Sequence, residues 1–232
     1  MDEELTARGF WGPRQETPDQ IADKLVAFVT GLNDVVGDDI TWSAPGLRGQ
    51  SLADPEVARQ VISKAFADNT DAPHLGISQA YDARGKKIKM ISITMGVGGY
   101  SDSPKMQNRF VLDWFGDGGS ALADPILRHI VSVWDPDWAD VTAMSFMEAL
   151  IDVQPVGKPT PKVGYLTYLS EARAQALPGG LENHKTNLDG GGAIIGSGEG
   201  DGFLSVDKAT EFAKVLRLSP AFSPTPTDRS KF

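Results

Sequence analysis

Two stretches near the middle of the chain constrain its fold more than any other feature of the sequence. Residues 87–94 largely alternate polar and apolar side chains, as a strand with one buried face does. Residues 108–115 have the composition of a second strand, and glycines at 96, 98 and 99 separate the two stretches. This arrangement predicts two strands that pair as antiparallel neighbours.

Helix starts stand out on both sides of this pair. Residues 17–20 (TPDQ) combine an N-cap, a proline at the first helical position and the glutamine of a capping box. Apolar residues then recur at helical spacing as far as Leu32. Further helices are predicted from Asp54-Pro55, from Asp124-Pro125, over 206–218, and briefly from Ser170 to Ala176. Further strands are predicted over 3–10, 41–43, 142–148, 163–169 and 192–196.

Helices and strands follow one another without steady alternation, which favours an α+β fold. We expect a mixed, largely antiparallel sheet packed against helices, in a single domain over residues 1–219. The Pro/Lys/Gly-rich segment 155–161 marks a possible sub-boundary. Residues 220–232 are rich in Pro, Ser and Thr, and we expect a mobile tail there.

The charge balance bears on the kind of partner. The 232 residues include 22 Lys and Arg against 31 Asp and Glu, a formal net charge of −9. Such a surface repels nucleic acid and anionic lipid and favours a basic partner, although it also serves plain solubility. We expect neither a nucleic-acid nor a membrane partner.

Compartment and thiol chemistry follow from what the sequence lacks. The absence of cysteine excludes disulfides and thiol catalysis, and it fits a reducing compartment. The first residues carry no apolar signal-peptide core, and no apolar run approaches the roughly 18 residues that span a bilayer. We expect a cytoplasmic protein.

The glycine-rich stretch 190–202 resembles two ligand sites without matching either. The dinucleotide fingerprint needs a third glycine at 195, where Ile195 stands. Residues 197–208 imitate a calcium loop, but Ser197 and Lys208 occupy positions that need acidic ligands. Tight turns beside a short strand explain the glycines.

The usual catalytic patterns are also missing. The histidines at 74, 129 and 184 lie far apart and form no His-Glu-x-x-His pair, and there is no Gly-x-Ser-x-Gly elbow. We expect no catalytic residue, no metal and no cofactor. A hydrolase with paired carboxylates near Asp113, Asp135 or Glu148 is the alternative.

Aromatic and charged residues near predicted element ends carry more information. Most of the five tryptophans are expected in the core, with Trp138, beside Asp137 and Asp140, as the best candidate for an exposed interface anchor. Arg14 and Glu16 follow a predicted strand and precede a capped helix, so we expect a salt bridge or a cap contact from them.

Several different short motifs follow one another along residues 4–218. They resemble the immunity protein 52 family of bacterial polymorphic-toxin systems, through residues 11–16 (WGPRQE), a later Trp, residues 134–136 (WDP), residues 164–170 (GYLTYLS) and a Gly-Gly turn before an apolar strand. The motif residues that we interpret as scaffold are Trp11, Gly12, Arg14, Glu16, Trp42, Trp134, Pro136, Gly164, Tyr165, Tyr168, Gly191 and Gly192.

The resemblance implies a protein that binds a cognate secreted toxin and blocks it. Toxins paired with this family resemble restriction-endonuclease-like nucleases, often delivered by contact-dependent or type VI secretion. A nuclease presents a basic groove for phosphates, and an anionic inhibitor can be steered onto that groove. An adaptor of a secretion machine is a further alternative. The residues that we expect to bind the partner are Asp68, Asp71, Asp117, Trp138, Glu199 and Asp201.

Overall fold

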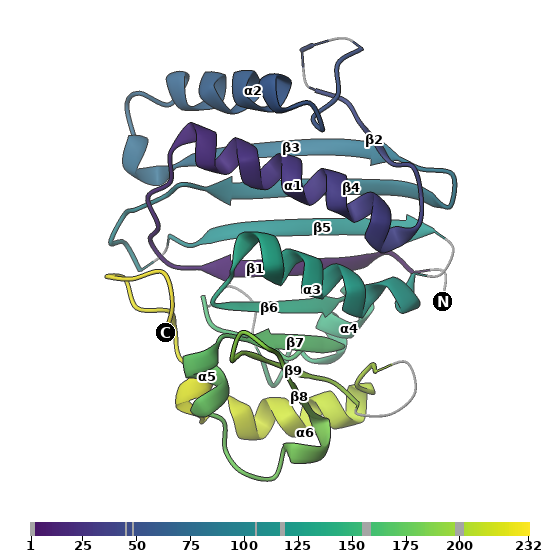
Figure 1. The fold of residues 1–232 in the computed structure, drawn as a ribbon. Helices are drawn as coiled ribbons and strands as arrows, with labels where there is room; N and C mark the ends of the chain where they lie inside the picture. Colours follow the sequence, from purple (N-terminus) through teal and green to yellow (C-terminus); the bar gives the residue numbers. More distant parts are fainter. Residues whose placement is uncertain are drawn as a thin grey trace.

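One antiparallel sheet organises the molecule. The computed structural model describes residues 3–44, 46–47, 49–104, 106–116, 119–154, 159–197 and 202–232. Across these residues the nine strands lie in the order β2-β3-β4-β5-β1-β6-β7-β9-β8 (Figure 1). The strands are β1 Leu5–Trp11, β2 Thr41–Trp42, β3 Ile77–Arg84, β4 Ile88–Val97, β5 Asn108–Gly116, β6 Trp138–Thr142, β7 Leu166–Leu169, β8 Lys185–Asn187 and β9 Ala193–Ile195.

Helices of very different length pack on this sheet. They are α1 Pro18–Val36, α2 Pro55–Ala67, α3 Ala123–Trp134, α4 Met144–Ala149, α5 Glu171–Gln175 and α6 Val206–Leu216. Because a single sheet runs through the chain with helices packed against it, the predicted α+β fold in a single domain is confirmed. Residues 155–158, at the possible sub-boundary, lie outside the described residues.

Helix α1 begins and ends as its sequence predicts. The Thr17 hydroxyl accepts from the Gln20 amide and the Gln20 side chain accepts from the Thr17 amide, which completes the capping box. Gly37 ends the helix in the left-handed conformation. The apolar stripe that includes Leu25 and Phe28 is fully buried. Helices α1, α2 and α3 therefore cover one face of β3, β4, β5 and β1 (Figure 1).

The antiparallel pair predicted from the alternating stretches is confirmed. Strands β4 and β5 pair antiparallel, with Ile93 opposite Leu112 on the covered face and Thr94 opposite Val111 on the other. Strand β1 lies on the far side of β5, so it pairs with both β5 and β6 and occupies the middle of the sheet. Strand β3, Ile77–Arg84, is an element for which the sequence pattern gave no prediction.

The strand predicted over residues 142–148 is wrong. Strand β6 ends at Thr142, and α4 runs from Met144 to Ala149. Every residue of β6 is buried, including Asp140, whose charge Arg8 balances from β1. Because β6 is buried on both faces and contains a paired charge, its sequence does not alternate between apolar and polar residues. The apolar residues of α4 resemble those of a strand, and this placed the predicted strand too late in the chain.

The residues after 219 pack against the body of the protein. A 3-10 turn, Pro220–Phe222, contacts α5, and Phe222 and Thr225 are buried. Further along, the amide of Gly12 donates to the carbonyl of Ser230 at 2.9 Å. These contacts differ from the expectation of a mobile tail.

Candidate binding surface

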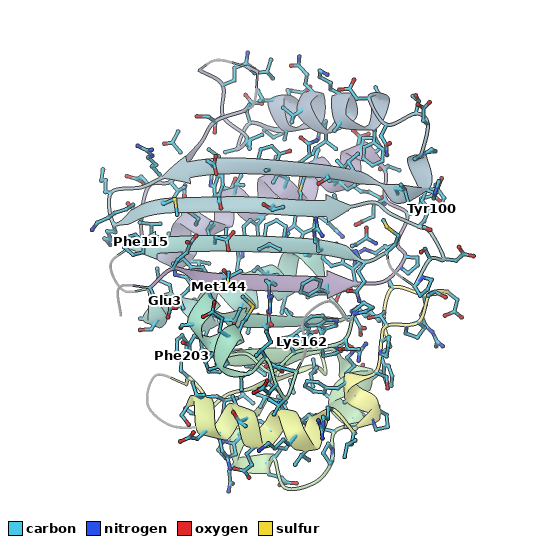
Figure 2. The ribbon with its side chains drawn as sticks, turned by 180° about the vertical axis from the view of Figure 1, so that it is seen from behind. Glu3, Tyr100, Phe115, Met144, Lys162 and Phe203 are labelled. Atoms are coloured by element: carbon cyan, nitrogen blue, oxygen red, sulfur yellow. The ribbon has the colours of Figure 1, made fainter. Side chains whose placement is uncertain are left out.

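In the described part of the chain, the face of the sheet opposite α1, α2 and α3 carries no helix over β3, β4 and β5. Figure 2 shows this face, with Phe115 near one end of the strands and Tyr100 near the other. Helix α4, marked by Met144, lies on this side below β1 (Figure 2). The register places twelve residues on this side, which we call the open sheet face: Ser78, Ala80, Asp82, Ser92, Thr94, Gly96, Arg109, Val111, Asp113, Thr6, Arg8 and Phe10.

All twelve residues are half-buried or exposed, in contrast to the buried residues that alternate with them. Small and hydroxylated side chains dominate on β3 and β4, so this part of the face is flat. Charged groups of both signs lie on it. The Thr6 hydroxyl donates to Asp113 at 2.6 Å, while Arg109 and Asp82 form no ion pair with any described residue.

Arg8 forms the lower border of the face. Its Nε donates to Asp140 Oδ1 at 2.8 Å and its Nη2 to the second carboxylate oxygen, a bidentate pair. Burial lowers the pKa of Arg8, but the charge of Asp140 and the hydrogen bond to it outweigh that effect and raise the pKa. The pair fixes β1 to β6 across the exposed side of the sheet.

A cleft of about 1040 Å³ opens at the end of the strands, beside Tyr100. Its walls come from the end of α2, the start of β3, and the loops that follow β1 and β4. The lining includes Phe10, Asp68, Leu75, Ser78, Gln79, Met106 and Arg109. The cleft therefore joins the open sheet face to the predicted partner-binding residue Asp68.

The first sequence motif, residues 11–16, packs against a cluster of stacked aromatic rings. Trp11 stacks on Trp134 with ring centroids 6.1 Å apart, and Phe110 stacks on Trp134 at 4.7 Å. Arg14 lies over the Trp11 ring and donates from Nη2 to the carbonyl of Trp134 at 2.8 Å. It also forms an ion pair with Glu16 at 3.3 Å. The predicted salt bridge is present. The backbone contact of Arg14 falls at the C-terminal end of α3 and not at the start of the helix that follows Glu16.

A buried polar network lies just beyond the C-terminal end of α3. The carboxylate of Asp137 accepts from Arg173 Nη2 at 2.7 Å, from Ser170 Oγ at 2.9 Å and from Thr225 Oγ1 at 2.7 Å. Arg173 also donates to two carbonyls of the C-terminal segment, and its guanidinium lies 4.7 Å from the centre of the Phe232 ring. Sequence reasoning missed this network, because nothing local pairs an Asp with an Arg on a distant helix.

The second set of motif residues packs around this network. A side chain on Gly192 would place its Cβ 2.7 Å from Tyr168 Cε2, so the glycine lets the aromatic ring approach the backbone. Gly191 takes a positive φ of 84° in the turn before β9. Burial, together with the charges of Asp135 and Asp137, raises the pKa of the Tyr168 phenol to about 12.

The remaining motif residues are also structural. Trp42 is 1% exposed, and the Tyr165 ring stacks on Phe203 and contacts Phe146 at a tilt. Gly164 lies where a Cβ would collide with the carbonyl of Val141. Pro136 packs beside Gly9 of β1. The interpretation of the motifs as scaffold fits each of these positions.

The residues predicted to bind a partner have different outcomes. Asp68 and Asp71 are both exposed at the end of α2, near the cleft. Asp117, Glu199 and Asp201 lie outside the described residues. The exposure predicted for Trp138 is wrong: it is 3% exposed, and its ring stacks on Phe10 at 4.2 Å. Its neighbour Asp137 is fully buried, so two adjacent acidic residues did not imply an exposed segment.

The residues considered for catalysis lie in different environments. Asp113 accepts from Thr6, Asp135 pairs with Lys231, and Glu148 is exposed on α4. His129 stacks on Phe28 and its Nε2 lies 2.9 Å from the carbonyl of that residue. No three acidic or histidine side chains in the described part of the chain form a group that could hold a metal ion. Within the same ranges, no helix has the length and apolar character needed to cross a membrane.

Comparisons with known proteins show the fold alone. No protein-family model matches the chain, and no curated protein matches it. Among solved structures, the chain is similar to the Pseudomonas aeruginosa T6SS protein PA0821, with a TM-score of 0.50 and 11% identity. The similarity covers 92% of this chain and 73% of that chain. At this identity it supports a shared arrangement of helices and strands.

Proposed function

We propose that this chain is an immunity protein, which binds a cognate secreted toxin and neutralises it by covering its active site. The observation that carries the proposal is the open sheet face with the cleft at its end. Among the described residues, this face of β3, β4 and β5 carries no helix and presents a broad, rigid surface, and rigid surfaces bind proteins with little loss of conformational freedom. Occlusion by such a surface requires no reaction from the inhibitor.

Two further observations support the proposal. Most residues of the motifs that resemble the immunity protein 52 family pack inside the protein, as expected of a scaffold that presents variable surface residues. The similar solved structure is named as a T6SS protein, and type VI secretion is a setting in which toxins and immunity proteins are paired. We propose that the chain belongs to such a system and acts in the cytoplasm of the producing cell.

We further propose that the toxin is a nuclease with a basic groove. The net charge of −9 provides long-range attraction to such a groove and would accelerate association at low ionic strength. The exposed carboxylate of Asp68 lines the cleft, and Asp71 follows it in the same loop, so both are placed to contact cationic residues that otherwise bind phosphates.

The test is co-expression with the open reading frame adjacent to the gene of this chain. Induction of the adjacent protein alone should arrest growth and degrade nucleic acid, and co-expression of this chain should restore growth and yield a stable complex. An unrelated nuclease toxin serves as the control and should remain toxic. Persistent arrest with soluble chain present, or substrate turnover by the purified chain alone, would contradict the proposal.

A further inference from the structure

The outer edge of β3 is unpaired over most of its length. Strand β2 pairs with β3 only at Arg84 and Ala83, so the segment Ile77–Asp82 has no strand on its outer side among the described residues. An exposed strand edge offers backbone N–H and C=O groups that an extended polypeptide can match.

The geometry identifies which residues face this edge. Alternate residues of a strand direct their N–H and C=O groups to opposite sides. The carbonyl of Gly76, just before β3, accepts from Asn69 at the end of α2 at 2.6 Å. Arg84, of the same parity, lies opposite Thr41 of β2. The intervening residues of that parity are Ser78, Ala80 and Asp82, all of which are exposed.

Contacts close the edge at both ends and leave its centre open. Asn69 occupies the start, β2 occupies the end, and the Gln79 side chain donates to the carbonyl of Ser78 at 2.8 Å. Neither Ala80 nor Asp82 has any such substitute among the described residues. Helix α2 lies beyond β3 in both views, in the layer of α1, which it contacts (Figures 1 and 2).

The cleft described above opens against this edge. Its lining includes Asp68 and Asn69 on one side and Ile77, Ser78 and Gln79 on the other. A chain entering from the cleft would therefore reach the unpaired backbone of β3 directly. Asp82 forms no ion pair with any described residue, so a Lys or Arg opposite it would gain a cross-strand charge pair.

We propose that the partner adds an extended segment of polypeptide, with a cationic residue near Asp82, as a new strand on the edge of β3. This inference rests on the proposed function and specifies how the toxin is held. Main-chain hydrogen bonds supply affinity, and Asp82 supplies selectivity for a basic segment. The added strand lies beside the open sheet face and anchors the partner next to it.

The test compares amide hydrogen exchange of the free chain with that of its complex with the adjacent-gene protein. The amides of Ser78, Ala80 and Asp82 should exchange rapidly in the free chain and become protected in the complex. If the complex forms and these amides still exchange rapidly, this inference fails while the proposed function stands. If no complex forms, both fail.

A pair of substitutions at one position separates the edge from the face. Ala80→Pro removes one edge N–H, which an edge strand tolerates, and should weaken binding about tenfold or more. Ala80→Thr keeps the N–H and enlarges the side chain on the open sheet face, and should change binding less than about threefold. The reverse order of effects would overturn the inference.

A third variant guards against a folding defect in Ala80→Pro. Asp82→Lys changes an exposed side chain only, and should weaken binding several-fold, with thermal unfolding unchanged. Unaltered binding by this variant would exclude the basic segment. Protection of the same amides in the chain alone, with a concentration-dependent dimer in sedimentation, would show a second copy as the occupant and overturn the inference.

Discussion

Asp137 and Arg173 form an ion pair in which both side chains are fully buried, with 2.7 Å between the carboxylate and the guanidinium. The two residues lie 36 positions apart, one before β6 and one on α5. Each also bonds to the segment after residue 220, so a single charge pair joins the sheet, a helix and the end of the chain.

Arg173→Met should destabilise the protein by about 3–5 kcal/mol, because it leaves a buried carboxylate without its counter-charge. Urea unfolding measures this, and protease cleavage after residue 220 should accelerate in parallel. Lys64→Met is the control, since the Lys64–Asp68 pair is exposed and such a pair contributes about 1 kcal/mol or less. Equal effects of the two changes would show that the buried network does not hold the tail.

Gly192→Ala should cost about 1–3 kcal/mol, because its Cβ would lie 2.7 Å from Tyr168 Cε2 and 2.8 Å from the carbonyl of Leu169. Gly190→Ala is the matched control in the same turn, where an added Cβ meets nothing within 4 Å. Thermal or urea unfolding compares the two. A similar cost for both would indicate that turn entropy, and not the approach to Tyr168, requires glycine.

Asp38 should make stability sensitive to acid. Its carboxylate accepts from the amides of Ile88, Lys87, Lys86 and Asp39, and these bonds hold its pKa below the usual range. A lowered folded-state pKa stabilises the protein above the unfolded pKa of about 3.9, and this stabilisation is lost as the pH falls through the folded value.

Urea unfolding between pH 7 and pH 2 tests this expectation. Asp38→Asn should be less stable than the original chain at pH 7, and the two curves should converge at the acidic end. Asp39→Asn, which alters only an exposed pair with Lys86, should follow the original curve. A constant gap at every pH would contradict the assigned role.

Charge reversal at the cleft should slow toxin binding beyond the effect of net charge. The double change Asp68→Lys and Asp71→Lys should reduce the association rate constant roughly tenfold at low salt and flatten its salt dependence. Asp207→Lys with Glu211→Lys on α6, at the opposite end of the sheet, alters the net charge equally (Figure 1). Stopped-flow kinetics showing the same loss for both pairs would remove the cleft from the interface.

Elements with local signals could be predicted from the sequence. The capping box formed by Thr17 and Gln20 predicts the start of α1. The alternation over 87–94 predicts β4 and, with residues 108–115, its pairing with β5. In both cases the deciding interactions lie close together in sequence, and the structure confirms them.

Elements that depend on distant partners could not be predicted. Strand β6 buries Asp140 because Arg8, 132 residues away, balances its charge. Trp138 is buried because Phe10 stacks on it, and the tail packs because Arg173 reaches its carbonyls. The open edge of β3 was equally invisible, since it follows from the shortness of β2 and not from the composition of β3.

The central place of β1 has a consequence for how the chain is made. Its two neighbours, β5 and β6, begin at Asn108 and Trp138, so one edge of β1 stays unpaired until β5 has been synthesised and the other until β6 has been synthesised. Contacts of such long sequence separation slow folding. Newly made molecules would thus expose the edges of β1 for a time, and the rate at which β5 and β6 pair with it would set how soon each molecule can bind its partner.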